Sequence, residues 1–149
     1  MTLRTRIHDA VTAAMRSGDE LRRDTLRMAY NAIYNAEKRD AREYTDEEVL
    51  TVLSREVKTR RESVDAFRKG GREDLASKEE REIGILAEFL PAELSDEELA
   101  ALVDEAIAAT GATSPRELGR VMTALGPRTR GRADGRRVAG LVAQRLAGP

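Results

Sequence analysis

The sequence contains no cysteine and no tryptophan, and its 149 residues include only three tyrosines and two phenylalanines. Without cysteine the chain has no disulfide framework, no thiolate nucleophile and no zinc-thiolate site. This composition fits a reducing compartment, and we expect a cytoplasmic protein. No run of about 18 apolar residues is present that could cross a bilayer, so we expect no membrane partner.

The N-terminal residues also lack the apolar centre of a secretory signal. They are instead amphipathic, with Arg4 and Arg6 beside Leu3 and Ile7, a feature shared with mitochondrial presequences. Because the apolar stripe continues smoothly to Val11, we interpret this segment as the first helix of a bundle.

Charged residues are abundant, and their signs are segregated along the sequence. They make up 36% of the chain, against 40% hydrophobic residues, which is typical of a soluble helical protein and makes sheet unlikely. The formal net charge of -1 conceals eight arginines against two acids in residues 111–149, and ten basic against 20 acidic residues in residues 40–110. An arginine-dense C-terminal segment attracts phosphate or an acidic protein.

Apolar spacing and helix-ending residues predict four helices in the N-terminal part of the chain. Thr45 and Glu48 form a capping box, in which each side chain bonds the backbone amide of the other residue. Pro91 disfavours helical geometry in the residue before it, so the fourth helix must end by Leu90. The expected helices span approximately residues 3–17, 19–41, 45–69 and 73–90.

The helical pattern restarts beyond Pro91 with shorter units, beginning at a second capping box of Ser95 and Glu98. We therefore place a domain boundary near residues 91 to 94. The sequence predicts an all-α protein with an N-terminal helical bundle of about four helices over residues 1–92. A smaller C-terminal three-helix domain is predicted over residues 93–149.

Local signals also bound the last two helices of this smaller domain. Residues 114–117 combine a cap, a first-turn proline and a glutamate at the third helical position. We expect the helix that follows to break at Gly126-Pro127 and to lead into a loop over residues 128–133. Asp134 is a natural N-cap for the final helix.

Several stretches of the chain are similar to the GatB/YqeY domain family. They are Thr25-Leu26-Arg27 with Ala32-Ile33, and residues 56–63, 67–76, 89–95 and 131–135. The resemblance covers essentially the whole chain and implies an N-terminal helical domain followed by a three-helix domain. The family includes small stand-alone proteins and the helical tail of the B subunit of the aspartyl/glutamyl-tRNA amidotransferase.

The resemblance implies that this tail engages tRNA in the amidotransferase. It also implies that ATP, magnesium and the transamidation chemistry belong to a separate domain that precedes the tail. Two positions depart from the family pattern, because Arg120 and Arg128 stand where lysine is often expected. The positive charge is retained, although the geometry of a phosphate contact would differ.

Residues that could carry catalysis are not combined in a recognisable pattern. The only histidine, His8, has no paired serine or cysteine nucleophile and is interpreted as a solvated side chain. The acidic runs 46–48 and 96–98 fall in first helical turns, where carboxylates favour the helix dipole, so we interpret them as caps and not as metal ligands. Residues 79–82 are interpreted as a solvated helical face. We expect no catalytic residues, no metal and no cofactor.

The candidate nucleic-acid-binding residues are six arginines near the C-terminus. Two of them fall in the first turn of the last predicted helix, where basic residues oppose the helix dipole and free amides attract anions. The alternative interpretation is a passive solvated surface. No aromatic residue follows residue 90, so recognition would be of backbone and shape and not by stacking. The six are Arg120, Arg128, Arg130, Arg132, Arg136 and Arg137.

Three functional hypotheses follow. The leading one is a non-catalytic RNA-binding module that contacts tRNA or another structured RNA through the C-terminal domain, with the N-terminal bundle as a scaffold. The second is a protein-protein adaptor that uses the acidic middle and the basic C-terminal surface. The third, implied only by the family resemblance, is an accessory to carbon-nitrogen ligase activity with glutamine as the amide donor.

Overall fold

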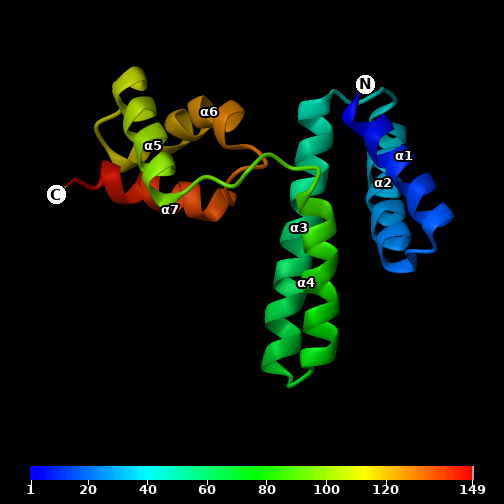
Figure 1. Ribbon diagram of the computed structural model, residues 1–149. Helices are drawn as coiled ribbons and strands as arrows, with labels where there is room; N and C mark the ends of the chain where they lie inside the picture. Colours follow the sequence, from blue (N-terminus) through cyan, green and yellow to red (C-terminus); the bar gives the residue numbers. More distant parts are fainter. Residues whose placement is uncertain (149) are drawn as a thin grey trace. The chain divides into compact units, whose positions relative to one another are not determined.

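The computed structural model describes residues 1–148, which form an all-α protein (Figure 1). Seven α-helices and one 3-10 turn make up the regular structure of these residues, and no strand occurs among them. The predicted all-α class is therefore confirmed. The chain divides into two compact units, which we call unit 1 (Met1–Pro91) and unit 2 (Ala92–Pro149), and each is described separately.

Unit 1 is a bundle of two helical pairs. Helix α1 packs along α2, α3 packs along α4, and α2 also contacts both α3 and α4 (Figure 1). The helices are α1 (Leu3–Ser17), α2 (Glu20–Asp40), α3 (Asp46–Lys69) and α4 (Glu73–Ala87).

The predicted starts of α1 and α3 are confirmed by side-chain caps. The Thr2 hydroxyl accepts a hydrogen bond from the Thr5 amide at 3.1 Å. At the start of α3, the Glu48 amide donates to the Thr45 hydroxyl at 3.3 Å, and the Thr45 amide donates to the Glu48 carboxylate at 3.2 Å. Gly18 ends α1 with a φ of 77°, a left-handed conformation that favours glycine.

The core of unit 1 is apolar and receives residues from all four helices. On α2, Leu26, Ala29 and Ile33 follow helical spacing and are fully buried. Complete burial of a large aliphatic side chain stabilises a fold by roughly 1.5 to 3 kcal/mol. The buried cluster is Leu3, Ile7, Leu26, Ala29, Ile33, Val49, Leu53, Val57, Leu86 and Phe89.

A buried ion pair links α3 to α4 outside this cluster. Arg60 and Glu82 are only 5% and 7% exposed, and the Arg60 Nε donates to the Glu82 carboxylate at 3.0 Å. Nη1 of the same arginine donates to the Glu56 carboxylate at 2.8 Å. The interpretation of residues 79–82 as a solvated face is therefore wrong for Glu82, because α4 turns that residue toward α3.

Unit 2 has a separate apolar core. Its elements are α5 (Asp96–Thr110), the 3-10 turn η1 (Pro115–Glu117), α6 (Leu118–Thr129) and α7 (Gly135–Leu146). All three α-helices pack against one another. The buried cluster is Leu94, Leu99, Val103, Ala106, Ala112, Val121, Leu125, Val138, Val142 and Leu146.

Helix α6 continues through Pro127, so the predicted break at Gly126-Pro127 is wrong, and Arg128 and Thr129 belong to the helix. A proline inside a helix removes one backbone donor and crowds the carbonyl four residues earlier. Here the buried face of α6 extends past the proline, because Thr129 is buried as well as Leu125. The Thr129 hydroxyl donates to the Leu125 carbonyl at 3.1 Å, which holds the last turn in place.

Candidate nucleic-acid interface

The six candidate arginines lie within one continuous part of unit 2. Arg120 and Arg128 are on α6, and Arg130 and Arg132 follow directly after it. Arg136 and Arg137 stand in the first turn of α7. Because α6 and α7 pack against each other, the fold brings the two helical pairs of arginines onto adjoining elements.

The start of α7 is built as the sequence predicts. Asp134 is the N-cap, and its carboxylate accepts a hydrogen bond from the Arg136 amide at 2.9 Å. The turn before it is held by the amides of Arg132 and Ala133, which both donate to the Thr129 carbonyl. This part of the arginine cluster therefore sits on an ordered backbone.

Two of the six arginines hold the segment that leads into α5. The Arg132 Nε donates to the Ala92 carbonyl at 3.1 Å, and the Arg137 Nη1 donates to the Leu94 carbonyl, also at 3.1 Å. A backbone bond from the Leu94 amide to the Arg132 carbonyl at 2.8 Å completes the contact. Sequence reasoning missed this structural role, because it depends on residues about 40 positions away.

Four of the six arginines also pair with carboxylates of unit 2. Arg120 pairs with Glu117 of η1, and the other three pair with residues at or near α5. The distances are 2.9 Å for Arg120 to Glu117, 2.8 Å for Arg128 to Glu105, 3.9 Å for Arg132 to Glu98 and 2.5 Å for Arg137 to Asp96.

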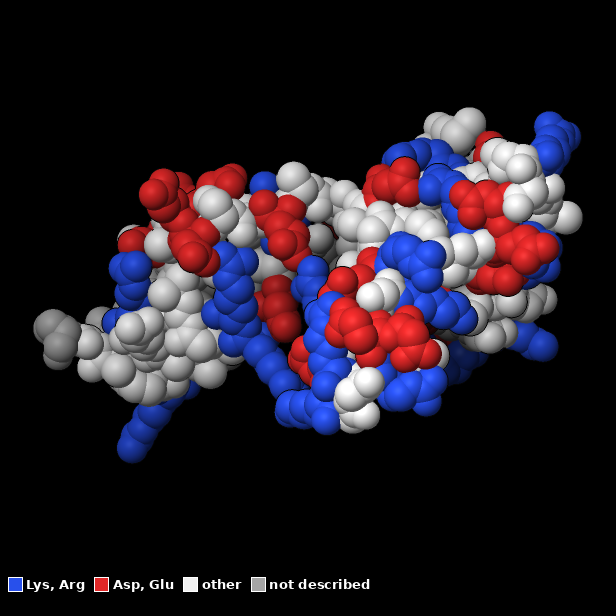
Figure 2. Space-filling view, turned by 60° about the horizontal axis from the view of Figure 1, so that its bottom comes forward, with Lys and Arg blue, Asp and Glu red and all other residues white. Residues whose placement is uncertain are grey.

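These ion pairs change how the segregation of charge along the sequence is interpreted. Residues 111–149 are arginine-rich, but unit 2 also contains acidic α5, and residues 92–149 hold eight arginines against eight carboxylates. Figure 2 shows basic and acidic side chains intermixed on the face in view. The positive segment of the sequence is therefore largely neutralised within its own unit.

Two of the paired carboxylates are also helix caps. The amides of Thr113 and Ser114 donate to Glu117 at 2.6 and 3.1 Å, and these backbone bonds hold the pKa of Glu117 below its usual range. The Ser95 amide and hydroxyl lower the pKa of Glu98 in the same way. Both groups stay ionised near neutral pH, so they remain charged partners for Arg120 and Arg132.

Arg136 differs from the other members of the set. Its side chain is exposed and makes no hydrogen bond or ion pair with any residue from 1 to 148. It projects from the first turn of α7, where the Asp134 carboxylate caps the helix by accepting from the Arg136 amide and leaves the Arg136 guanidinium unpaired. A phosphate could therefore approach Arg136 without first displacing a carboxylate.

The residues considered for catalysis or metal binding are dispersed. The His8 ring lies on α1, 3.7 Å from the Asp9 carboxylate and beside the ring of Tyr30. Within residues 1–148, no group of three or more His, Asp or Glu side chains is placed to hold a metal ion. No helix in that part of the chain is long and apolar enough to cross a membrane.

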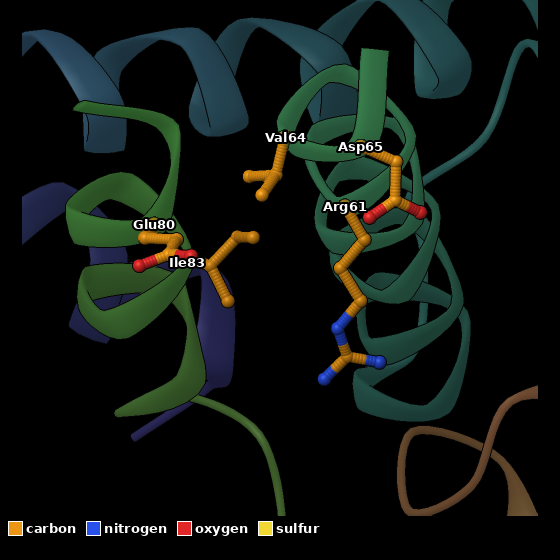
Figure 3. Close-up of a pocket in the computed structure, with 5 residues that line it drawn as sticks. All are labelled: Arg61, Val64, Asp65, Glu80 and Ile83. Carbon is orange, nitrogen blue, oxygen red and sulfur yellow. The ribbon is translucent and has the colours of Figure 1, made fainter. Parts of the chain in front are cut away.

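A shallow hollow of about 370 Å³ lies between α3 and α4. Figure 3 shows Val64 and Ile83 pointing toward one another across it, with Arg61, Asp65 and Glu80 at its edge. The hollow is lined by the apolar contact between Val64 and Ile83, with the three charged residues around it.

Comparison with known proteins places the chain in a family context. The model of the family described as "Yqey-like protein" matches residues 4–146. An uncharacterized protein of Schizosaccharomyces pombe, C22F3.15, is 40% identical over 72 residues, which are 48% of this chain and 58% of that protein.

A second relative is the Eremothecium gossypii protein named "Altered inheritance of mitochondria protein 41, mitochondrial". It is 36% identical over 94 residues, which are 61% of this chain and 51% of that protein. The chain thus spans little more than half the length of either relative.

Proposed function

The chain belongs to the Yqey-like protein family, and from that premise we propose that it is a non-catalytic RNA-binding module. Unit 2 would contact the phosphate backbone of a structured RNA such as tRNA, in the cytoplasm. The observation that carries this proposal is the exposed Arg136 side chain, free of any carboxylate partner among residues 1–148, at the ordered start of α7.

The other arginines contribute in two ways. Arg120 and Arg128 are more than half exposed in their ion pairs. Exposed pairs of this kind contribute only about 0 to 1 kcal/mol, so a phosphate can replace the carboxylate, and the guanidinium geometry suits that exchange. Arg132 and Arg137 donate to backbone carbonyls, so their main role is to position the segment before α5.

The test is direct binding of purified tRNA to the full chain over a range of salt concentrations. Replacing Arg136 by alanine should weaken binding and reduce the slope of log K against log salt by roughly 0.7 to 0.9. Arg55→Ala is the matched control, because Arg55 is an exposed arginine of unit 1 whose side chain also has no partner within residues 1–148. Equal losses in both variants would indicate diffuse attraction, and no binding at low salt would refute the proposal.

A protein-protein adaptor is the second candidate, and the charge balance of unit 2 favours it. Eight arginines and eight carboxylates give little long-range attraction to a polyanion, whereas alternating charges suit a complementary protein surface. In the tRNA experiment, this candidate predicts no binding at any salt concentration.

We further propose that the two units are separate domains, a four-helix and a three-helix one, joined near Pro91. Each has its own buried cluster, and α5 begins with its own capping box at Ser95 and Glu98. Limited proteolysis should cut first between about residues 90 and 96. First cuts inside α3 or α5 would contradict the boundary.

A further inference from the structure

One face of α2 combines basic and aromatic side chains, of which Arg27, Tyr34 and Lys38 are exposed and the others half-buried. Arg23, Arg27, Tyr30, Tyr34 and Lys38 follow one another along the helix, and at 100° per residue they fall within an arc of roughly 80°. The apolar stripe of α2 points elsewhere, into the core of unit 1. Tyr34 is 56% exposed, an unusual environment for a large aromatic side chain.

Helix α1 extends this face across the helix pair. The His8 ring lies 5.5 Å from the Tyr30 ring at an angle of 56°. Arg27 Nη2 lies 3.4 Å from the Met15 sulfur, and Met15 is 55% exposed. We call the surface made by His8, Met15, Arg27, Tyr30, Tyr34 and Lys38 the Tyr34 face.

The cations of the Tyr34 face are available to a ligand. Among residues 1–148, Arg27 donates its side-chain hydrogen bond to the Met15 sulfur and interacts electrostatically with Asp24, whereas the Lys38 side chain has no partner. Carboxylates do border the face, because Arg23 bonds Asp24 at 2.8 Å and Asp9 lies beside His8. We therefore leave Arg23 out of the site.

We propose that the Tyr34 face binds single-stranded RNA through unpaired bases. Tyr34 presents an exposed ring on which a base can stack. About 6 Å along the helix axis, Tyr30 is half-buried against the core of unit 1, and the exposed His8 ring beside it presents the second ring surface. Arg27 and Lys38 lie on either side of Tyr34 and neutralise phosphates. This inference extends the proposed RNA binding to a second site, since unit 2 has no aromatic residue with which to stack.

An acidic protein is the competing occupant, and the composition of the face disfavours it. A stable protein interface buries about 800 Å² on each partner around an apolar centre. Among the residues of the Tyr34 face, only Met15 and Tyr34 are large hydrophobic side chains with about half their surface exposed. Rings flanked by cations fit the stacking and charge of a nucleic acid strand better.

The experiment measures fluorescence polarisation of a labelled oligouridylate of about 12 nucleotides, a length within the range of single-strand sites, with the full chain at low salt. Tyr34→Ala should weaken binding about tenfold, whereas Tyr34→Phe, which keeps the ring, should stay within about twofold. Lys38→Ala should weaken binding about threefold. The matched control is Lys58→Ala on α3, an exposed lysine without a partner among residues 1–148, and it should bind like the wild type.

Three results would overturn the inference: no binding of the oligouridylate at low salt, an unchanged affinity in Tyr34→Ala, or tighter binding of an oligoglutamate peptide of equal length. The last result would identify an acidic protein as the ligand of the Tyr34 face.

Failure of this inference is distinguishable from failure of the proposed function. If tRNA binds and Arg136→Ala weakens it while the oligouridylate does not bind, only the Tyr34 face is refuted. If the oligouridylate binds through Tyr34 and tRNA binding does not depend on Arg136, only the unit 2 site is refuted.

Discussion

Units 1 and 2 use the same pairing of arginine with carboxylate in opposite environments. In unit 1, Arg60 and Glu82 pair with less than a tenth of either residue exposed. In unit 2, Arg128 and Glu105 pair at a similar distance with more than half of each side chain exposed. The distance between the charged groups therefore says little about how much an ion pair contributes to the stability of the fold. Burial makes the first pair structural, whereas exposure leaves the second free to exchange partners.

The largest expected effect is at the buried pair. Glu82→Ala should destabilise unit 1 by about 3 to 5 kcal/mol, because it removes the buried ion-pair partner of Arg60 and leaves its guanidinium paired with the partly exposed Glu56. The free energy of unfolding from urea titration is the measurement. The double variant Arg60→Met with Glu82→Leu serves as control and should recover most of the loss, since it leaves no charge buried. Loss below about 1 kcal/mol would place Glu82 in effective contact with water.

A smaller effect is expected where unit 2 depends on a local hydrogen bond. Asp134→Ala should destabilise unit 2 by about 1 kcal/mol, because it removes the acceptor for the Arg136 amide at the start of α7. Amide hydrogen exchange of α7 measures the change. Asp104→Ala, which removes an exposed carboxylate paired with Arg145 but no cap, is the control. If both variants lose the same protection, capping is not the cause.

Local signals explain how much of the fold was predictable. The starts of α1, α3, α5 and α7 follow from the side chains of Thr2, Thr45, Ser95 and Asp134, which bond amides within three residues. The continuation of α6 through Pro127 was not predictable from local breaking signals, because tertiary burial of Thr129 outweighs the strain at the proline.

The candidate site was less predictable, because its pairing is tertiary. The sequence identifies the six arginines but not that acidic α5 lies against them, since Arg128 and Glu105 are 23 positions apart. The buried position of Glu82 was hidden for the same reason. A count of charge over a whole structural unit, starting at residue 92 in place of 111, would have shown the balance.

Acid should weaken an exposed pair that is also a cap. The Arg42 guanidinium and then the Thr45 amide lower the pKa of Glu48 from 4.5 to about 2. A carboxyl group whose pKa is lower in the folded chain contributes stability above its unfolded pKa and loses it as the pH falls through the folded one. Stability should therefore fall between about pH 4.5 and pH 2, measured by urea midpoints.

Glu48→Gln is the matched variant for that measurement, because it keeps the size of the side chain and removes its titration. The difference in midpoint between wild type and Glu48→Gln should shrink as the pH falls from about 4.5 toward 2. A constant difference across this range would mean that Glu48 has the same pKa in the folded and unfolded chain.

The smallest stability effect is expected at the exposed pair of unit 2. Arg128→Ala and Glu105→Ala should each change the free energy of unfolding by less than about 1 kcal/mol, since each removes one partner of an exposed ion pair.

The effects of these two variants on tRNA binding should have opposite signs. Arg128→Ala removes a cation that can contact phosphate, whereas Glu105→Ala removes the carboxylate that competes for it. Filter binding at several salt concentrations should therefore show weaker binding in the first variant and tighter binding in the second. Weaker binding in both would mean that the pair is needed intact, and the proposed exchange of a carboxylate for a phosphate would be wrong.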